Sequence, residues 1–229
     1  MELSSTKHYY GPRGEYLKEH ENYFSDKQLK KDLSFLKNAL KLKKTDKILD
    51  IGCGHARHTI ELKKQGFDIH GLDASEYLIK LAKKQSKKEK LSIKFYNQNI
   101  HSLNIKQKYD KAFIFFSDLA SINLDKAIKN IKKILQPNGL FLLDSDNFQR
   151  LIRYQKQHPE SPYIFDKNTM ILKDKATGKL IVKYYKVPEL KKLFTKNKFK
   201  VISIYGNYKK DPIDNKSDRI IIIAQNLIK

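Results

Sequence analysis

The stretch Lys47–Ser75, KILDIGCGHARHTIELKKQGFDIHGLDAS, decides the fold because two short apolar runs end in it at unusual residues. The first run, Ile48–Ile51, leads into Gly52 and Gly54 and then changes to helical spacing. The second run ends in Asp73. Glycine has no Cβ, so the backbone can turn tightly and approach a ligand closely. An acid at the end of the neighbouring strand can accept hydrogen bonds from ribose hydroxyls. The pattern therefore predicts a nucleotide-type ligand at the carboxyl edge of a parallel sheet.

The spacing of the small residues distinguishes two classes of cofactor. A dinucleotide-binding turn reads G-x-G-x-x-G/A, and its last small residue would fall on Arg57, which is too large for tight packing of strand and helix. The spacing G-x-G-x-G falls instead on Gly52, Gly54 and Ala56, and it requires no pyrophosphate. This favours an adenosine cofactor without a diphosphate group.

Strands and helices are expected to alternate along the chain. Asp26 is a candidate cap for a first helix, Ser75 for a later one, and Gly66 for a left-handed helix end. The periodicity predicts helices over 26–43, 57–65, 124–135, 147–157 and 188–197, and one that begins after Ser75 with Leu78, Ile79 and Leu81 on one side. It predicts strands over 47–51, 67–73, 91–97, 109–116, 140–146, 199–206 and 218–226. Two further strands, joined by a turn around 174–178, are expected within 163–186. This order predicts an α/β fold with a parallel sheet covered on both faces.

Composition indicates one domain over 1–229. The chain is 40% hydrophobic, which suffices for a core, and no apolar run approaches the length of a membrane span. The first residues contain acids and no apolar stretch, so we expect no secretory signal and a cytoplasmic protein. A single cysteine, Cys53, excludes an internal disulfide framework.

The formal net charge of +22 attracts anions and keeps nucleic acid open as a partner. Only five of the 47 basic residues are arginine, however, and the lysines are spread over the whole chain. Specific recognition of phosphates and bases favours arginine. We therefore favour codon bias in an AT-rich genome as the origin of the charge, rather than a nucleic-acid surface.

The chain resembles the class I S-adenosylmethionine-dependent methyltransferases, in the branch that modifies mostly small molecules. LDIGCGHARHTIELKKQGFDIHGLDAS is similar to the first two cofactor motifs of that family, and QKYDKAFIFFSDLASI to its fourth-strand segment. IKKILQPNGLFLLD and the C-terminal part resemble its later elements. The resemblance implies a Rossmann-like sheet of seven mostly parallel strands in the order 3-2-1-4-5-7-6. Strand 7 would be antiparallel, and helices would lie on both faces.

The resemblance also implies which residues bind S-adenosyl-L-methionine. One group would surround the methionine part of the cofactor, an acid would bind the ribose, and apolar and amide side chains would contact the adenine. These residues are Asp50, Gly52, Cys53 and Gly54, then Asp73, then Ala74, Leu78, Asn99 and Ile100, with Phe116 below the cofactor. Cys53 is interpreted as a small packing residue rather than a nucleophile.

Two residues depart from the family pattern. Ala56 replaces the usual third glycine, which the turn tolerates if its φ is negative. Asn99 replaces a common aspartate, so it would accept a hydrogen bond from adenine without charge assistance. His55 and His58 lie near a helix start, but no third ligand accompanies them locally, so no metal is expected.

The sequence identifies the residues that bind the methyl acceptor less clearly than those that bind the cofactor, because displacement at a sulfonium needs no obligatory catalytic residue. Substrate-facing candidates are Ser117, Asp118, Asn147, Tyr10 and Tyr185, although Asn147 and Asp118 are equally well explained as helix caps. Residues 1–25 are expected to form a lid, and residues 149–186 a cap built on a β-hairpin.

Three functions stay open. The favoured one is methyl transfer to an N or O atom of a small molecule. The second is methylation of RNA or another polyanion, against which the fourth strand ends in FFSD instead of a [DNS]-P-P-[YF] motif. The third is a non-catalytic S-adenosylmethionine-binding protein. The acceptor, a general base and the oligomeric state, monomer or homodimer, are not determined by the sequence.

Overall fold

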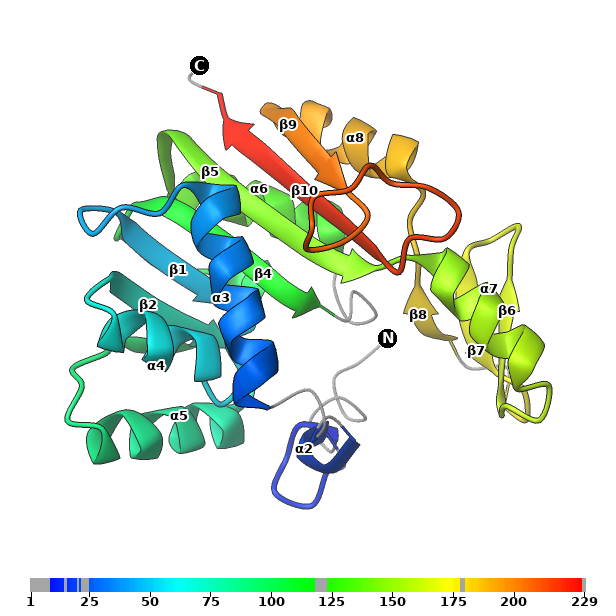
Figure 1. The fold of residues 1–229 in the computed structure, drawn as a ribbon, viewed down its shortest axis with the longest axis horizontal. Coiled ribbons are helices and arrows are strands. Elements are labelled where there is room, and N and C mark those ends of the chain that lie inside the picture. The colour runs from blue at the N-terminus through cyan, green and yellow to red at the C-terminus, as the bar shows by residue number, and fades with distance from the viewer. Residues whose placement is uncertain are drawn as a thin grey trace.

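The computed structural model describes residues 9–14, 16–19, 21, 25–117, 123–177 and 180–227. Seven strands form the main sheet in the order β3-β2-β1-β4-β5-β10-β9 (Figure 1). Their bounds are β1 (Lys47–Ile51), β2 (Asp68–Asp73), β3 (Phe95–Asn97), β4 (Tyr109–Ser117), β5 (Leu135–Asp146), β9 (Phe199–Tyr205) and β10 (Arg219–Asn226).

The strand directions agree with the predicted topology. β3, β2, β1, β4 and β5 are parallel neighbours, as in the register of Asp50 with Gly71 on one side and Phe113 on the other. β10 lies antiparallel between β5 and β9, with Ile222 opposite Leu143. The expected order 3-2-1-4-5-7-6, with an antiparallel seventh strand, is confirmed.

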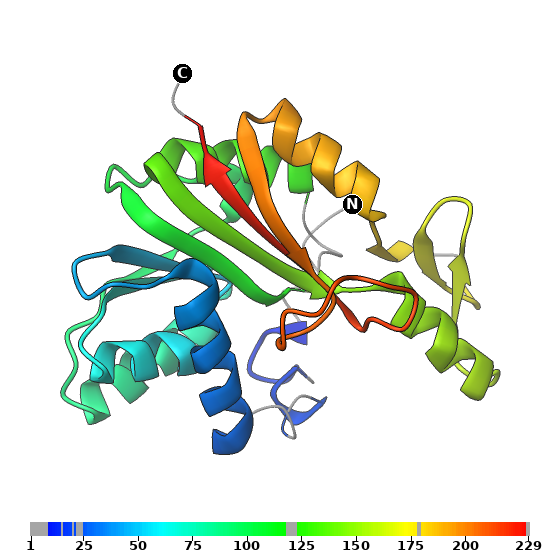
Figure 2. The ribbon, with the colours of Figure 1, turned by 45° about the horizontal axis from the view of Figure 1, so that its top comes forward.

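Helices cover both faces of this sheet (Figures 1 and 2). α3 (Asp26–Leu40) and α4 (Arg57–Lys64) pack on one face, and α6 (Leu124–Ile134) and α8 (Val187–Lys196) pack on the other. Ile48 belongs to the hydrophobic cluster on the α3 and α4 face, its neighbour Leu49 belongs to the cluster on the α6 and α8 face, and both are fully buried. Adjacent strand residues point to opposite faces, so a strand buried on both sides must be apolar throughout.

Short side chains define where the helices begin. Ser25, not Asp26, caps α3, because the Ser25 hydroxyl accepts the Gln28 N–H while Asp26 occupies the first turn. Ser75 caps α5 (Glu76–Lys88) as expected, accepting the Leu78 N–H. Gly66, with φ of 83°, takes the left-handed conformation expected after α4. Two shorter helices, α2 (Tyr16–Glu19) and η2 (Ile100–Ser102), complete this part of the fold.

A small unit projects from the sheet beyond the carboxyl end of β5 (Figure 1). It consists of α7 (Phe148–Gln157) and an antiparallel sheet of β6 (Tyr163–Asp166), β7 (Ile171–Asp174) and β8 (Leu180–Lys183). The expectation of a two-stranded hairpin is therefore wrong in strand number. Strands of four residues are too short for their alternation to be separated in the sequence. Phe165, Met170 and Leu172 give this unit a hydrophobic cluster of its own.

Candidate functional site

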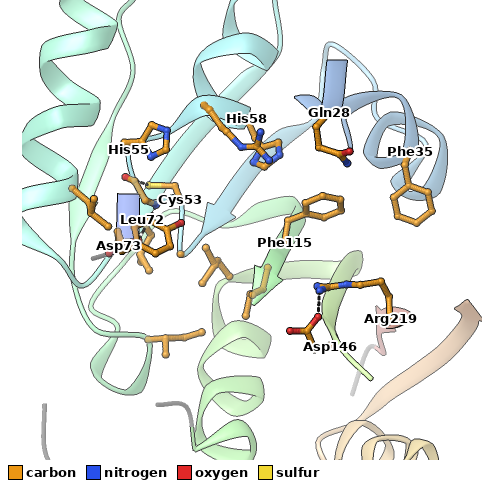
Figure 3. Close-up of a pocket in the computed structure, with 18 of the residues that line it drawn as sticks. Gln28, Phe35, Cys53, His55, His58, Leu72, Asp73, Phe115, Asp146 and Arg219 are labelled. Carbon is orange, nitrogen blue, oxygen red and sulfur yellow. Dashed lines mark hydrogen bonds and ion pairs between the residues drawn. The ribbon is translucent and has the colours of Figure 1, made fainter. Parts of the chain in front are cut away.

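A cavity of about 1680 Å³ opens at the carboxyl ends of β1, β2 and β4 (Figure 3). Pockets for one small ligand commonly enclose roughly 300–1,000 Å³, so this one has room for two molecules. We divide its lining into two halves. The glycine-loop half comprises Tyr9, Tyr10, Tyr16, residues 51–55, residues 72–75, Leu78 and residues 97–101. The basic half comprises residues of α3, Arg57, His58, Phe115, Asp146, Arg150, Asn207–Lys210, Asp218 and Arg219.

The loop after β1 is folded by backbone conformations that suit glycine. Gly52 and Gly54 have φ of 74° and 56°, in the left-handed region. The N–H groups of Gly52 and Cys53 both donate to the Leu72 carbonyl, at 2.7 and 3.0 Å. A Cβ on Gly54 would lie 3.7 Å from the Tyr16 hydroxyl, an ordinary contact distance, so the positive φ and not lack of space favours glycine there. The loop lines the cavity, where Gly52 is exposed while Cys53 and Gly54 are buried.

Ala56 departs from the expectation of a negative φ. Its φ is 68° and its ψ 32°, the same left-handed region as Gly54. A side chain in this region costs roughly 1–2 kcal/mol. The conformation persists because the Ala56 N–H donates to the Cys53 carbonyl at 2.8 Å and the Ala56 carbonyl accepts the first helical bond of α4. The condition under which the sequence predicted tolerance is therefore not met, and these hydrogen bonds accompany a left-handed alanine.

Asp73 connects the glycine loop to the end of β2. Its Oδ2 accepts the Gly54 N–H at 2.9 Å, and its Oδ1 accepts the Ser75 N–H at 2.8 Å. Burial raises the pKa of this carboxyl, and the backbone N–H groups of Ser75, Gly54 and Ala74 oppose that rise. A carboxylate has about four acceptor positions, so Asp73 keeps acceptor capacity for a ribose hydroxyl besides its backbone partners. The residues present thus fit an adenosine ligand.

Asp50 and Cys53 support the loop from behind. Asp50 is 2% exposed, is not part of the cavity lining, and accepts the Thr59 hydroxyl at 2.7 Å. Burial raises the pKa of Asp50 to about 6. Cys53 is buried beside Gly71, where a Cβ would lie 2.9 Å from its sulfur. Burial raises the pKa of the Cys53 thiol, so it stays protonated and inert, consistent with a packing role.

Ala74, Leu78, Asn99 and Ile100 all line the glycine-loop half, on the side of α5 and η2. Leu78 and Ile100 are almost fully buried and form an apolar surface there. The Asn99 side chain caps η2, because its Oδ1 accepts the His101 N–H at 2.9 Å. One acceptor atom of Asn99 is therefore already used by the fold, which the sequence did not indicate.

Three tyrosines of the N-terminal segment close one side of this half. The rings of Tyr9 and Tyr10, and those of Tyr10 and Tyr16, lie 4.9 Å apart. The Ser75 hydroxyl donates to the Tyr10 carbonyl at 2.9 Å, which ties the segment to the start of α5. Burial raises the pKa of Tyr16 to about 12, so its hydroxyl stays neutral beside the loop.

The basic half is organised by Asp32, a fully buried acid of α3. Its Oδ2 accepts from Arg57 Nη2 at 2.9 Å and lies 3.1 Å from His58 Nε2, and its Oδ1 accepts from Gln28 at 2.7 Å. These contacts fix α3 against the start of α4. Sequence reasoning missed Asp32, because its partners lie 25 and 26 residues away on another helix.

Aromatic rings form the wall between β4 and the loop over 206–218. Tyr208 stacks on Phe115 at 5.2 Å and packs on Phe35 at 5.1 Å. Its hydroxyl donates to Asp144, which also accepts from Arg219 Nε at 2.8 Å. Arg219 makes a second ion pair with Asp146 at the cavity edge (Figure 3). The wall is thus anchored by a buried polar network across β5 and β10.

The acceptor-side candidates meet different outcomes. Tyr10 lines the cavity. Asn147 does not, and instead caps α7 by accepting the Gln149 N–H, so of its two interpretations the structural one is observed. Tyr185 packs against the core on the α6 and α8 face, away from the cavity. Asp118 and the side chains of Phe116 and Ser117 lie outside the described residues.

Within the described part of the chain, no group of three His, Cys, Asp or Glu residues is placed to hold a metal ion. No helix among these residues is both long and apolar enough to cross a membrane.

Comparison with known proteins places this geometry in a family. Residues 42–202 match the methyltransferase domain family. A ubiquinone biosynthesis O-methyltransferase of Pelagibacter ubique is 31% identical over 142 residues, which cover 61% of this chain and 55% of that protein. An S-adenosylmethionine-dependent methyltransferase from Clostridium acetobutylicum has a similar fold, with a TM-score of 0.72 at 18% identity over 93% of this chain and 99% of that one. Magnesium protoporphyrin IX methyltransferase from Synechocystis, solved with bound SAH, has a TM-score of 0.65 at 14% identity over 97% and 98%.

The matched region contains the glycine loop, Asp73 and the five parallel strands β1 to β5 that position the cavity. The chain belongs to the methyltransferase domain family and is a class I S-adenosylmethionine-dependent methyltransferase.

Proposed function

We propose that the protein methylates an N or O atom of a small molecule. The observation that carries this proposal is one continuous cavity of about 1680 Å³, whose glycine-loop half suits the cofactor and whose second half suits an acceptor beside it. The acceptor would be enclosed by α3, β4 and the 206–218 loop. The similarity to a protein named as an O-methyltransferase supports an oxygen acceptor.

In this proposal the residues of the glycine-loop half bind the cofactor. Gly52, Cys53 and Gly54 contribute backbone around its methionine part, and Asp50 supports this loop from behind. Asp73 accepts the ribose hydroxyls. Ala74, Leu78, Asn99 and Ile100 surround the adenine. Phe116, which follows Phe115 on β4, is assigned to the position below the cofactor.

When bound, S-adenosylmethionine would supply a methyl group on a sulfonium, whose sulfur can leave with the bonding electron pair. The protein's task is to hold the acceptor in line and exclude water. We assign water exclusion to residues 1–25 as a lid, supported by Tyr9, Tyr10 and Tyr16 in the lining. Residues 149–186 are proposed as a cap, since α7 contributes Arg150 to the cavity.

The proposal is tested by calorimetric titration of the full chain with S-adenosylmethionine and, separately, with NAD. We expect binding of S-adenosylmethionine alone, followed by transfer of a labelled methyl group to a component of a small-molecule pool. Tight binding of the cofactor without transfer to any pool would favour a non-catalytic binding protein. Transfer only to an RNA fraction would favour the polyanion alternative.

A further inference from the structure

We infer that the acceptor is a small anion, carrying a carboxylate or a phosphate group that Lys209, Lys210 and Arg150 bind in the basic half. This inference rests on the proposed function and adds the chemical class of the substrate. It is carried by the distribution of charged side chains around the cavity, rather than by the net charge of the chain.

Arginine is concentrated at this cavity. The chain has only five arginines, and three of them, Arg57, Arg150 and Arg219, line it. A fourth, Arg153, forms an ion pair with the lining residue Asp218. Arg57 and Arg219 are nearly buried and hold the acids Asp32 and Asp144 of the fold, whereas the Arg150 side chain is 46% exposed and can reach a ligand besides its ion pair with Asp146. The planar guanidinium with its five donors is the side chain best suited to carboxylate and phosphate.

In the loop over 206–218, two lysines line the cavity and two acids do not. Lys209 and Lys210 line the cavity, whereas the acids Asp211 and Asp214 do not. Asp211 accepts from the Asn207 side chain at 2.8 Å. Asp214 accepts from the Ser217 hydroxyl at 2.8 Å, and this bond lowers the pKa of Asp214. The acids are thus used to fold the loop, and both adjacent lysines are directed to the cavity side.

The remaining acids of the basic half are already neutralised. Asp146 pairs with Arg150 at 3.1 Å and with Arg219, and Asp218 pairs with Arg153. Opposite the loop, Lys30 and Lys31 of α3 add two further cations to the lining. Among the described residues, none of the four lining lysines lies within 4 Å of a carboxylate oxygen. An excess of positive charge therefore faces the cavity, and a recess of one sign raises the local concentration of oppositely charged ligands.

The aromatic rings between β4 and the 206–218 loop indicate what kind of molecule bears the anionic group. The rings of Phe35, Phe115 and Tyr208 line the same half of the cavity as the lysines. The body of the acceptor would contact this apolar surface while its charged group reaches the loop. Benzoate and phenyl phosphate have this shape and serve as probes for the two anion types. Benzyl alcohol has a similar body without the charge.

The experiment compares wild type, K209Q/K210Q and R150Q with the control K83Q/K84Q. The control removes two adjacent exposed lysines of α5, outside the cavity, and so causes the same change in net charge as the loop variant. Each protein is titrated calorimetrically with the three probes, both with and without saturating S-adenosylmethionine. Cofactor affinity is measured separately for each variant.

We expect one of the anionic probes to bind wild type and the control alike, and to bind K209Q/K210Q about fivefold more weakly. R150Q should show a smaller loss. The affinity for benzyl alcohol should be the same in wild type and in every variant. Whether benzoate or phenyl phosphate responds identifies the anion.

Equal loss in K209Q/K210Q and the control, or no binding of either anion to wild type, would overturn the inference while leaving the proposed function intact. A 20-mer oligoribonucleotide is also tested as a competitor of the anionic probe. If its affinity falls equally in K209Q/K210Q and in K83Q/K84Q, the inferred anion site would be replaced by a diffuse surface that binds polyanions. Failure of S-adenosylmethionine to bind wild type would instead remove the proposed function. The titrations without cofactor still decide whether the anion site exists.

Discussion

At the scale of single residues, the site depends on carboxylates buried for different purposes. Asp73 uses both oxygens to hold backbone N–H groups of the glycine loop and of α5 in place. Asp50 is farther from the cavity and supports the loop through Thr59. The loop is therefore already ordered for a ligand, which reduces the entropy lost on binding.

We predict that Asp73→Asn weakens binding of S-adenosylmethionine about 30-fold. The amide keeps the side-chain volume but replaces one acceptor by a donor, and hydrogen bonds to charged groups contribute about 1.5–3 kcal/mol. Asp68→Asn, the same change at the other end of β2, is the control and should not alter the dissociation constant. An affinity of Asp73→Asn within twofold of wild type would place the ribose elsewhere.

We predict that Asp50 lowers stability as the pH rises from about 4 to 6. Its pKa is raised by burial from 3.8 to about 6, so the folded state binds a proton that the unfolded chain has released. The stabilisation by this group is therefore complete below pH 4 and is lost as the pH rises through 6, by on the order of 3 kcal/mol.

The measurement is urea unfolding of wild type and Asp50→Asn at a series of pH values. An amide cannot ionise, so the variant should gain stability relative to wild type between pH 4 and 6 and then hold a constant difference. Parallel pH profiles for the two proteins would show that Asp50 does not titrate in this range.

At the scale of elements, one asparagine joins α7 to the 206–218 loop. Asn147 Oδ1 accepts the Gln149 N–H at 3.2 Å, its Nδ2 donates to the Ser217 carbonyl at 3.0 Å, and its own N–H donates to the Asp218 carbonyl at 2.9 Å. The side chain is 2% exposed. The helix start and the loop that closes the basic half are thus held by the same residue.

We predict that Asn147→Ala lowers the free energy of unfolding by about 1–2 kcal/mol, the usual effect of losing a helix cap with one further buried hydrogen bond. Amide exchange should rise in α7 and in the 206–218 loop. Ser25→Ala, which removes the cap of α3 only, should leave exchange in that loop unchanged. Because Asn147 lies outside the cavity lining, affinity for S-adenosylmethionine should stay within twofold of wild type.

At the scale of the whole molecule, a net charge of +22 on 229 residues makes the folded state repel itself. We predict that the melting temperature rises between 20 and 300 mM NaCl, by roughly 2–4 °C for each kcal/mol of repulsion screened. The measurement is thermal unfolding at both salt concentrations, with K83Q/K84Q as comparison. A smaller rise in that variant is expected, and a fall in melting temperature with salt would mean that attractive ion pairs dominate.

The sequence by itself determined the order of strands and helices and the residues at the strand ends. Alternating strands and helices, buried on both sides, predicted the doubly covered sheet, and Gly52, Gly54 and Asp73 at strand ends predicted the cofactor side of the cavity. These features are readable because periodicity and turn chemistry act between residues close in the chain. Two local predictions were nevertheless wrong. A two-stranded hairpin was predicted where three strands are observed, and Asp26 was predicted to cap the helix that Ser25 caps.

The tertiary structure alone decided the second half of the cavity. Asp32 meets Arg57 and His58 from another helix, Tyr208 meets Asp144 across 64 residues, and Arg219 meets the same acid across 75. The positive φ of Ala56 likewise follows from hydrogen bonds around it, not from its side chain. Such contacts leave no periodic trace in the sequence, because they form only when packing of the sheet and its helices brings distant segments together.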